Sequence, residues 1–469
     1  MPRTKNQFLR ALRLCVRQLG AAPFFPKSSN VKLNSTFPTR RKSELFFKLL
    51  YNLVIPVILL SVALDSSAQE MTSSPEPTST PKPKRSLERA IDEAWKTTWS
   101  RFYHPDTQLF YDYITSYQSR KSLAHLPRPE EVARQFPNGH GYDTGMEDCM
   151  ISAGVMLVMV VDRHAVTGDK KLSARAKAIF DGIRRAATVH GSPGFIARGI
   201  SVEDAQSTYP GTSRDQVTHV VHGLWYYYNS PLCNDETKEE VRALLTAIAD
   251  RMKRNVIPEN NYDFLRSDNS CEPIGLQRMW NVGGHEAARL PMIYAAAWNA
   301  TANDDYYHLY RKYIYEAIQQ SQMSVSHVST WGLLQMQASF ELLGSMEKDS
   351  ALQPAIAQMM RDIAVECRRR AKNAWNDGCN LDLTTVANDW RLPNGGIKSN
   401  GQYRKVWYCI RQSGESALAQ IIAGPAEFPD EQRRMLKGAI QRLDYNQVSS
   451  NGIYYLQAAY WKGRKMKIY

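Results

Sequence analysis

Four polar side chains recur along the segment from Thr212 to Tyr228 and together form a candidate site. They stand at positions i, i+4, i+7 and i+11: Asp215, His219, His222 and Tyr226. In an α-helix this spacing places all four on one face. A carboxylate, two imidazoles and a phenol on one face can transfer protons or contact a substrate. The opposite face is apolar and suits a core, so we expect the polar face to line a cavity.

Asp215, His219 and His222 also form an Asp-x3-His-x2-His array, which is compatible with zinc. Zinc helices of the HExxH type carry a catalytic Glu between the histidines, whereas Val220 and Val221 occupy that gap here. Structural hydrogen bonding by the two histidines is a further interpretation. We predict no metal and no other cofactor, and we assign His219 and His222 to substrate contact or proton transfer.

Carboxylates follow long loops at four places, each at the start of a predicted helix. These are Glu147-Asp148, Asp215, Glu286 and Glu415. Acidic residues in a first turn commonly cap a helix, and this is our interpretation of Glu415. Glycoside cleavage needs one carboxyl to protonate the leaving oxygen and a second to activate water or attack carbon. We predict Asp148 and Asp215 as this pair, because each has further ionisable neighbours, and Glu286 as a reserve acid.

A polysaccharide lyase would use similar side chains differently. In that reaction a Tyr or His removes the proton beside a uronate carboxyl, while a polar or cationic side chain neutralises the carboxyl. Residues available for these roles are His219, His222, Tyr209, Tyr226, Asn281, His285 and Arg214. The two interpretations differ in whether two carboxylates face each other in the cleft or a Tyr/His/Arg cluster lies there.

Aromatic and cationic side chains near loops and helix ends are candidates for sugar binding. Aromatic rings also fill cores, and a lone Arg more often forms a solvated ion pair. The predicted substrate-binding residues are Tyr142, Arg214, Trp225, Tyr226, Trp280, His285, Trp331 and Trp390. Arg278, Arg391 and Arg404 are further candidates for pairing with a uronate or a sulfate.

These residues are positioned by a chain in which helical signals dominate from Ser86 onward. We predict twelve helices, at about 87–102, 146–166, 172–189, 214–229, 235–254, 284–300, 304–322, 328–344, 351–374, 413–424, 429–443 and 452–463. Short links alternate with long loops rich in Gly, Pro, Asn and aromatic residues. Six helical hairpins in a ring would gather the short turns at one end and the long loops at the other, where they build a cleft.

Three segments carry a resemblance to six-hairpin, (α/α)6-toroid carbohydrate-active enzymes, which include glycoside hydrolases and polysaccharide lyases. They are Gly-Tyr-Asp-Thr-Gly-Met-Glu-Asp-Cys-Met-Ile (141–151), Arg-Gln-Ser-Gly-Glu-Ser-Ala-Leu-Ala-Gln (411–420) and the run from Tyr454 to Tyr460. The resemblance covers nearly all of residues 86–469 and implies an all-α toroid. A more distant similarity to unsaturated glucuronyl hydrolases implies two catalytic aspartates on different inner helices, in keeping with Asp148 and Asp215.

The chain of 469 residues has a net charge of +13, which belongs mostly to its first part. Residues 1–68 hold 11 Lys and Arg against 2 Asp and Glu, which leaves 48 against 44 for the remainder. The main domain therefore gives no case for a nucleic-acid partner. Basic residues at 40–48, an apolar stretch at 49–64 and small residues up to Ala68 predict a cleaved export signal rather than a membrane anchor. We expect a secreted or periplasmic protein with no stable membrane partner, and a Pro/Ser/Thr-rich linker at 69–85.

Absent motifs narrow the function further. The sequence has no Walker loop, no strand-linked GxGxxG, no GxSxG and no HExxH, which disfavours nucleotide chemistry and serine hydrolysis. Among seven cysteines we expect at most one or two disulfides, with Cys367 and Cys379 the nearest pair. We therefore predict a domain at 86–469 that hydrolyses a glycosidic bond in an acidic carbohydrate. The alternatives are a lyase on a uronate polymer and a non-catalytic carbohydrate-binding toroid.

Overall fold

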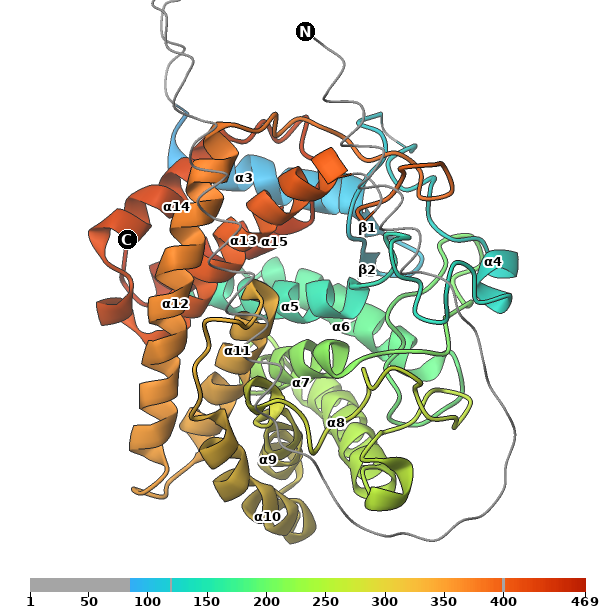
Figure 1. The fold of residues 1–469 in the computed structure, drawn as a ribbon, viewed down its shortest axis with the longest axis vertical. Coiled ribbons are helices and arrows are strands. Elements are labelled where there is room, and N and C mark those ends of the chain that lie inside the picture. The colour runs from blue at the N-terminus through green and yellow to red at the C-terminus, as the bar shows by residue number, and fades with distance from the viewer. Residues whose placement is uncertain (1–84, 119, 399–400) are drawn as a thin grey trace, which may run out of the picture. The chain divides into compact units, whose positions relative to one another are not determined.

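A computed structural model describes residues 85–118, 120–398 and 401–469, which belong to one compact unit. The predicted export signal and all but the last residue of the predicted linker lie outside the described residues. In the described part the regular structure is thirteen α-helices, short helical turns and one two-stranded sheet (Figure 1). Twelve of the helices are long: α3 (Leu87–Thr97), α5 (Cys149–Thr167), α6 (Leu172–Thr188), α7 (Arg214–Tyr228), α8 (Asp235–Asn255), α9 (Arg289–Thr301), α10 (Asp304–Ser321), α11 (Thr330–Met346), α12 (Gln353–Cys379), α13 (Gly401–Ala423), α14 (Asp430–Arg442) and α15 (Gly452–Lys465).

The long helices form two concentric rings. The inner ring runs α5, α7, α9, α11, α13, α15, with each helix in contact with the next and α15 packed against α5. The outer helices are α3, α6, α8, α10, α12 and α14. Each inner helix from α5 to α13 packs against the outer helix that follows it in the chain, and α15 packs against α3. In Figure 1, α5, α7 and α11 lie centrally, with α12 and α8 to either side. The fold is an (α/α)6 toroid, and the predicted fold class is confirmed.

Burial explains why the helices divide in this way. Outer helices bury one stripe, as in α6, where Leu172, Ala176, Ile179 and Ile183 face inward at helical spacing. Inner helices are buried on nearly all sides, and α5 is buried continuously from Cys149 to Asp162. By length and composition alone α5 could cross a membrane, but 78% of its apolar window is buried inside the protein. It is an inner-ring helix of the toroid.

The order of outer then inner helix places the N-terminal ends of all six inner helices at one end of the ring. Long segments lead into these ends, as at 98–148, 189–213 and 256–288. The first of them holds a π-helical turn (Thr98–Phe102), strands β1 (Tyr103–His104) and β2 (Leu109–Phe110) in antiparallel register, and the short helix α4 (Pro129–Ala133). The 256–288 segment contains the 3-10 turns Pro258–Asn260 and Gly284–Glu286, whereas the 3-10 turn Pro425–Glu427 lies in the short link between α13 and α14. We call the end with the inner-helix N-termini the cleft end.

One helix begins much earlier than predicted. The sequence predicts a helix from residue 413, whereas α13 begins at Gly401. The extra turns are rich in aromatic and β-branched residues, which favour strands and loops in isolation. Tyr403, Val406, Trp407 and Ile410 are nevertheless all buried, and their spacing of i, i+3, i+4 and i+7 is helical. Tertiary packing on this stripe overrides the local preference.

Two glycines allow α5 and α7 to approach closely, and this gives a first prediction. A Cβ on Gly154 would lie 2.2 Å from the backbone oxygen of His219, and a Cβ on Gly223 would lie 2.9 Å from the backbone oxygen of Gly154. Gly154→Ala should therefore push the two helices apart and lower the free energy of unfolding by about 1–3 kcal/mol. Urea denaturation checks this. The matched control is Gly344→Ala in α11, where the nearest atom is Ile356 Cγ2 at 3.4 Å and the substitution should be neutral or stabilising. Equal stability of the two variants would contradict the packing argument.

Candidate active site

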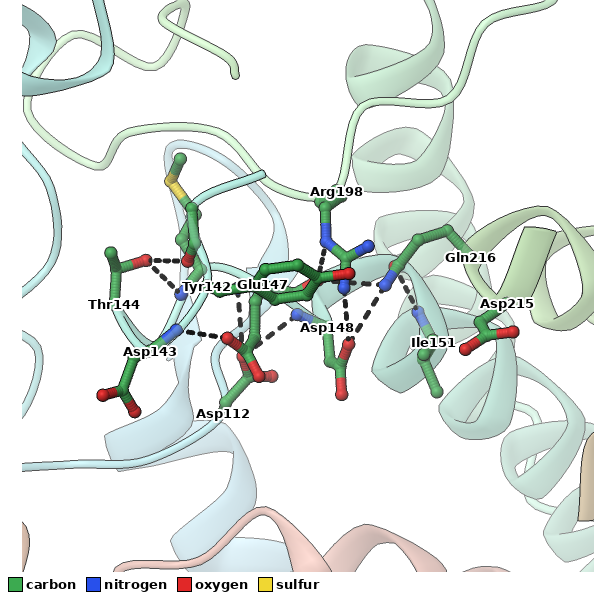
Figure 2. Close-up of polar contacts among 12 residues, drawn as sticks. Asp112, Tyr142, Asp143, Thr144, Glu147, Asp148, Ile151, Arg198, Asp215 and Gln216 are labelled. Carbon is green, nitrogen blue, oxygen red and sulfur yellow. Dashed lines mark hydrogen bonds and ion pairs between the residues drawn. The ribbon is translucent and has the colours of Figure 1, made fainter. Parts of the chain in front are cut away.

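A buried carboxylate holds the turn that precedes α5. Asp112 Oδ2 accepts hydrogen bonds from the backbone amides of Glu147 and Asp148, both at 3.0 Å (Figure 2). Burial raises the pKa of Asp112 well above its ordinary value, and the neighbouring charges of Asp148 and Glu147 add to this effect. The result is a rigid turn at the cleft end that presents two adjacent acids, each in a different environment.

Asp148 is surrounded by donors from three elements. Its Oδ1 accepts from Arg198 Nη2 at 3.2 Å and from Gln216 Nε2 at 3.1 Å, and its Oδ2 accepts from Arg411 Nη1 at 2.9 Å. The side chain is only 12% exposed. Two guanidinium groups and an amide therefore occupy both oxygens of this carboxylate. The geometry thus ties α5 to α7 and α13, and it disfavours the proton-transfer role predicted for Asp148.

Arg411 also binds Glu415. The sequence predicts Glu415 as a helix cap, but it does not cap a helix. Because α13 begins at Gly401, Glu415 lies in the middle of the helix, where it accepts from Arg411 Nε at 2.6 Å. The Arg411 guanidinium lies 4.8 Å from the ring centre of Trp407. One buried Arg therefore serves two buried carboxylates, which gives Glu415 a structural role in the wall of the site.

The environment of Glu147 differs from that of Asp148, although the two residues are adjacent in the chain. It is only partly buried, and its Oε2 accepts a short hydrogen bond from the backbone amide of Asp143. Burial raises the pKa of Glu147, with a further contribution from the charge of Asp148, and these effects outweigh Lys398 and Arg198. The sequence predicts Asp148 as the acid of the Glu147-Asp148 motif, whereas the raised pKa belongs to Glu147, because residue type alone does not distinguish the two acids.

Asp215 lies in the first turn of α7 and forms a close ion pair with Arg289 Nη1. Arg289 is buried, and its Nη2 donates to Gln335 Oε1 at 2.7 Å, which fixes the guanidinium. Burial raises the pKa of Asp215, but the charges of Arg289 and Arg214 outweigh it, so the pKa is lowered overall. The carboxylate is 30% exposed. It is therefore charged at neutral pH and accessible from the cleft end.

Tyr142 and Arg198 both interact electrostatically with Glu147 and with Asp215. The charges of both Glu147 and Asp215 act on Tyr142 and on Arg198. The Arg198 guanidinium lies 4.7 Å from the Tyr142 ring centre, and Lys398 Nζ lies 4.0 Å from it. Figure 2 shows the Tyr142 ring beside the Glu147-Asp148 turn, with Asp215 on the neighbouring helix. Two carboxyls with opposite pKa shifts thus share one region of the cleft end, next to a ring and two cations.

Three further predicted site residues lie beside this region. Arg214 Nε donates to Glu286 Oε1, and Arg214 Nη1 donates to the backbone oxygen of Gly275 at 2.7 Å. His285 Nε2 is 3.8 Å from Glu286 Oε1, and burial lowers the pKa of His285. These residues line or border a cavity of about 550 Å³ formed mainly by the 256–288 segment. Because Glu286 is already paired with Arg214, it is less suited to acid catalysis than Glu147.

The remaining residues of the α7 face do not join Asp215. At 1.5 Å per residue, Tyr226 is about 16 Å further along the helix. His219 is buried and faces a narrow cavity inside the inner ring; burial lowers its pKa to about 3. His222 Nε2 lies 3.0 Å from Glu341 Oε2, and Tyr226 accepts from Lys462 Nζ at 2.6 Å. His222 and Tyr226 therefore belong to a polar cluster distant from the cleft end. This position argues against the predicted catalytic role of His222 and the predicted substrate-binding role of Tyr226.

The tryptophans predicted to bind substrate also lie in different parts of the protein. Trp280 is 8% exposed and packs edge-on against Tyr313, so it belongs to the core. Trp225 stacks on His222, near the end of α7 that is distant from Asp215. Trp390 donates from Nε1 to the backbone oxygen of His125 and lies under Arg391, whereas Trp331 is partly exposed at the start of α11. Trp331 lines a cavity at the cleft end.

Neither a metal centre nor a disulfide is formed by the described residues. In the ranges 85–118, 120–398 and 401–469, no three His, Cys, Asp or Glu side chains are arranged to hold a metal ion. The six cysteines of these ranges are all unpaired. Cys367 and Cys379 both lie on α12, about 18 Å apart along the helix, and a disulfide requires Cα atoms within about 7 Å. The expected Cys367/Cys379 bridge is therefore wrong.

Comparisons with known proteins find similarity only at the level of solved structures. No protein-family model matches the sequence, and no curated protein matches it. A sugar epimerase from a ruminal bacterium has a TM-score of 0.45 and 12% identity, over 80% of this chain and 98% of that one. Cellobiose 2-epimerase from Spirochaeta thermophila has a TM-score of 0.42 and 13% identity, over 81% and 97% of the two chains. At these values the likeness says nothing about chemistry, which must be inferred from the residues of this chain.

Proposed function

We propose that this protein is a glycoside hydrolase that acts on an acidic carbohydrate, with Glu147 as general acid and Asp215 as the ionised partner. The observation that supports this proposal is the opposite pKa shift of the two carboxyls. Burial and Asp148 raise the pKa of Glu147, whereas Arg289 and Arg214 lower that of Asp215 despite burial. Pairs of acids whose environments separate their pKa values are typical of acid/base assignments in enzymes.

In the proposed reaction, Glu147 donates its proton to the glycosidic oxygen as the bond from that oxygen to the anomeric carbon breaks. Asp215 either accepts a proton from the attacking water or attacks the anomeric carbon itself, in which case water releases the sugar in a second step. Arg289 keeps Asp215 ionised until that step. Tyr142, supported by Arg198, lies beside Glu147 and is suited to contact the sugar ring.

One observation favours a different class of function. Asp148 and Asp215 both lie in ion pairs, with Arg198 and Arg411 in the first case and Arg289 in the second. A non-catalytic carbohydrate-binding toroid would use its acids in this structural way. The lyase alternative is less well supported, because burial raises the pKa of Tyr209 and of Tyr226, the two tyrosines available as its base, which makes them poor bases at neutral pH.

Incubation with a panel of polysaccharides tests the proposal. Both the formation of reducing ends and the absorbance of an unsaturated product are followed. Reducing ends without the absorbance are expected for a hydrolase. Both signals together would identify a lyase, and neither signal, with binding retained, would identify a binding protein.

Glu147→Gln tests the acid assignment and is our second prediction. We expect kcat on a natural oligosaccharide to fall by about 10²–10⁴-fold. The loss should be much smaller on an aryl glycoside such as a 4-nitrophenyl glycoside, because 4-nitrophenolate is a good leaving group that needs no protonation. The matched control is Glu203→Gln, an exposed acid in the loop before α7, which should leave both activities unchanged. Equal losses on the two substrates would contradict a general-acid role.

The pH profile gives an independent prediction. The acid form of Glu147 is lost as pH rises through its raised pKa, so activity should fall on the alkaline side. Asp215 is protonated only below its lowered pKa, so the acidic limb should lie below the ordinary range for aspartate. In Glu147→Gln, measured on the aryl glycoside, the alkaline limb should disappear. A profile that keeps the alkaline limb in this variant would assign the limb to another group.

A further inference from the structure

A second cavity at the cleft end has a composition unlike the first. It measures about 700 Å³ and lies between the end of α12, the first half of α13 and the start of α11. Trp331 and Tyr408 form an aromatic wall, and Arg404 and Lys405 lie beside it. No residue of the proposed acid pair lines this cavity, so it is available for binding rather than chemistry.

The aromatic wall is suited to a sugar ring. The ring centres of Trp331 and Tyr408 are 5.9 Å apart and their planes differ by 32°, so the two rings form a shallow, continuous surface. Both side chains are partly exposed, in contrast to the core aromatics of the inner ring. Ligand sites typically combine such aromatic surfaces with a few polar groups that fix orientation.

The polar groups here are cationic. Arg404 and Lys405 are exposed, and neither has a carboxylate partner among the described residues, although most other arginines of the site are paired. The Arg404 guanidinium lies 5.5 Å from the ring centre of Tyr408, at the edge of the aromatic wall. Asp377 is the single acid among the lining residues. An unpaired guanidinium next to a stacking surface matches a carboxylate or sulfate on a sugar ring.

Electrostatic proximity connects this cavity to the proposed acid. Burial raises the pKa of Tyr408, and the charges of Glu147 and Glu415 add to the rise against Arg411 and Arg404. Tyr408 is thus a neighbour of Glu147 as well as part of the cavity wall. We propose that the cavity is a subsite for an anionic sugar residue, a uronate or a sulfated sugar, which stacks on Trp331 and Tyr408 and pairs with Arg404 and Lys405. This assignment deepens the proposed hydrolase function and rests on it for the position of the scissile bond.

Binding measurements test the subsite separately from catalysis. Titration calorimetry with the Glu147→Gln protein uses oligogalacturonate, oligoalginate and chondroitin sulfate oligosaccharides, together with carboxyl-reduced and desulfated forms of each. We expect at least one acidic oligosaccharide to bind, and its neutral form to bind about tenfold more weakly or worse. Loss of affinity on carboxyl reduction identifies a uronate, and loss on desulfation identifies a sulfate. Equal affinity for charged and neutral forms, or no binding across the panel, would overturn the proposal.

The variant Arg404→Gln/Lys405→Gln should weaken the same binding by about tenfold or more and reduce its dependence on salt. Trp331→Ala should weaken binding of both charged and neutral forms. The matched control is Arg434→Gln/Lys437→Gln, an equal charge change on the exposed face of outer helix α14, which should leave the affinity unchanged. Circular dichroism confirms that each variant is folded. Unchanged affinity in the Arg404/Lys405 variant would sink the proposal.

Different results would contradict the hydrolase function and the subsite. If Glu147→Gln abolishes hydrolysis while the Arg404/Lys405 variant binds normally, the hydrolase assignment stands and the subsite is wrong. If acidic oligosaccharides bind through Arg404 and Lys405 but the unmodified protein releases no product, the subsite stands and the hydrolase assignment is wrong.

Discussion

Asp215→Asn should abolish the proposed hydrolysis, with an expected loss in kcat of about a thousandfold or more. Asparagine keeps the shape of the side chain and can still accept a hydrogen bond from Arg289, but it can neither attack carbon nor accept a proton from water. The measurement is the initial rate on the polysaccharide or aryl glycoside that the unmodified protein cleaves. Full activity of this variant would remove Asp215 from the mechanism.

The same substitution should also lower stability, which the sequence alone did not indicate. Arg289 is buried and relies on Asp215 for its closest counter-charge. We expect a fall of about 1–3 kcal/mol in the free energy of unfolding, measured by urea denaturation. Asp235→Asn is the matched control, because Asp235 is a first-turn acid of α8 that is fully exposed. It removes the same favourable interaction with a helix N-terminus and should change neither activity nor stability by a comparable amount.

Lys462→Met lowers the free energy of unfolding by about 3–5 kcal/mol. Lys462 is 2% exposed, and its Nζ lies 2.8 Å from Glu341 Oε1 and 3.4 Å from Asp162 Oδ2. It joins α15 to α11 and α5, and it donates to Tyr226 on α7. Methionine has a similar length but no charge, so two carboxylates would remain buried without their shared cation. Urea denaturation at neutral pH measures the effect.

Lys465→Met is the matched control for this cluster. Lys465 Nζ also contacts Asp162 Oδ1 and Tyr226, but its side chain is 35% exposed, so its loss should cost about 1 kcal/mol or less. Equal effects of the two variants would contradict the importance of burial. Lys462 and His222 lower the pKa of Glu341 against burial. A lowered pKa stabilises the fold at pH values above the unfolded pKa of Glu, so the contribution of Glu341 should persist at neutral pH and be lost only on acidification below that value.

The number and order of the helices could be predicted from sequence because periodic burial leaves a local signal. All twelve long helices overlap their predicted positions, since their apolar residues recur at helical spacing. The start of α13 differs from the prediction. There Tyr403, Val406 and Trp407 have helical spacing, but residues of these types locally favour other structures. Their burial depends on neighbours that are distant in sequence.

The proposed acid pair could be predicted only in part. Long loops before inner helices placed both the Glu147-Asp148 motif and Asp215 at the cleft end, but Glu147 and Asp148 are adjacent acids of nearly equal character. The distinction comes from Arg198 and Arg411, which lie 50 and 263 residues away from Asp148 and occupy its two oxygens. No local pattern encodes which of two neighbouring carboxylates will meet those guanidinium groups.

The polar face of α7 shows what the sequence determines and what the tertiary structure determines. It is formed by Asp215, His219, His222 and Tyr226. Helical geometry, which the sequence determines by itself, requires that the four share one face of α7. Their chemistry depends on the partners that the toroid brings to each turn: Arg289 from α9 at Asp215, Glu341 from α11 at His222, and Lys462 from α15 at Tyr226. The tertiary structure therefore divides one continuous face into an accessible carboxylate, a buried imidazole and a buried polar cluster. Charges act over a few ångströms, and only the closed ring of helices sets those distances.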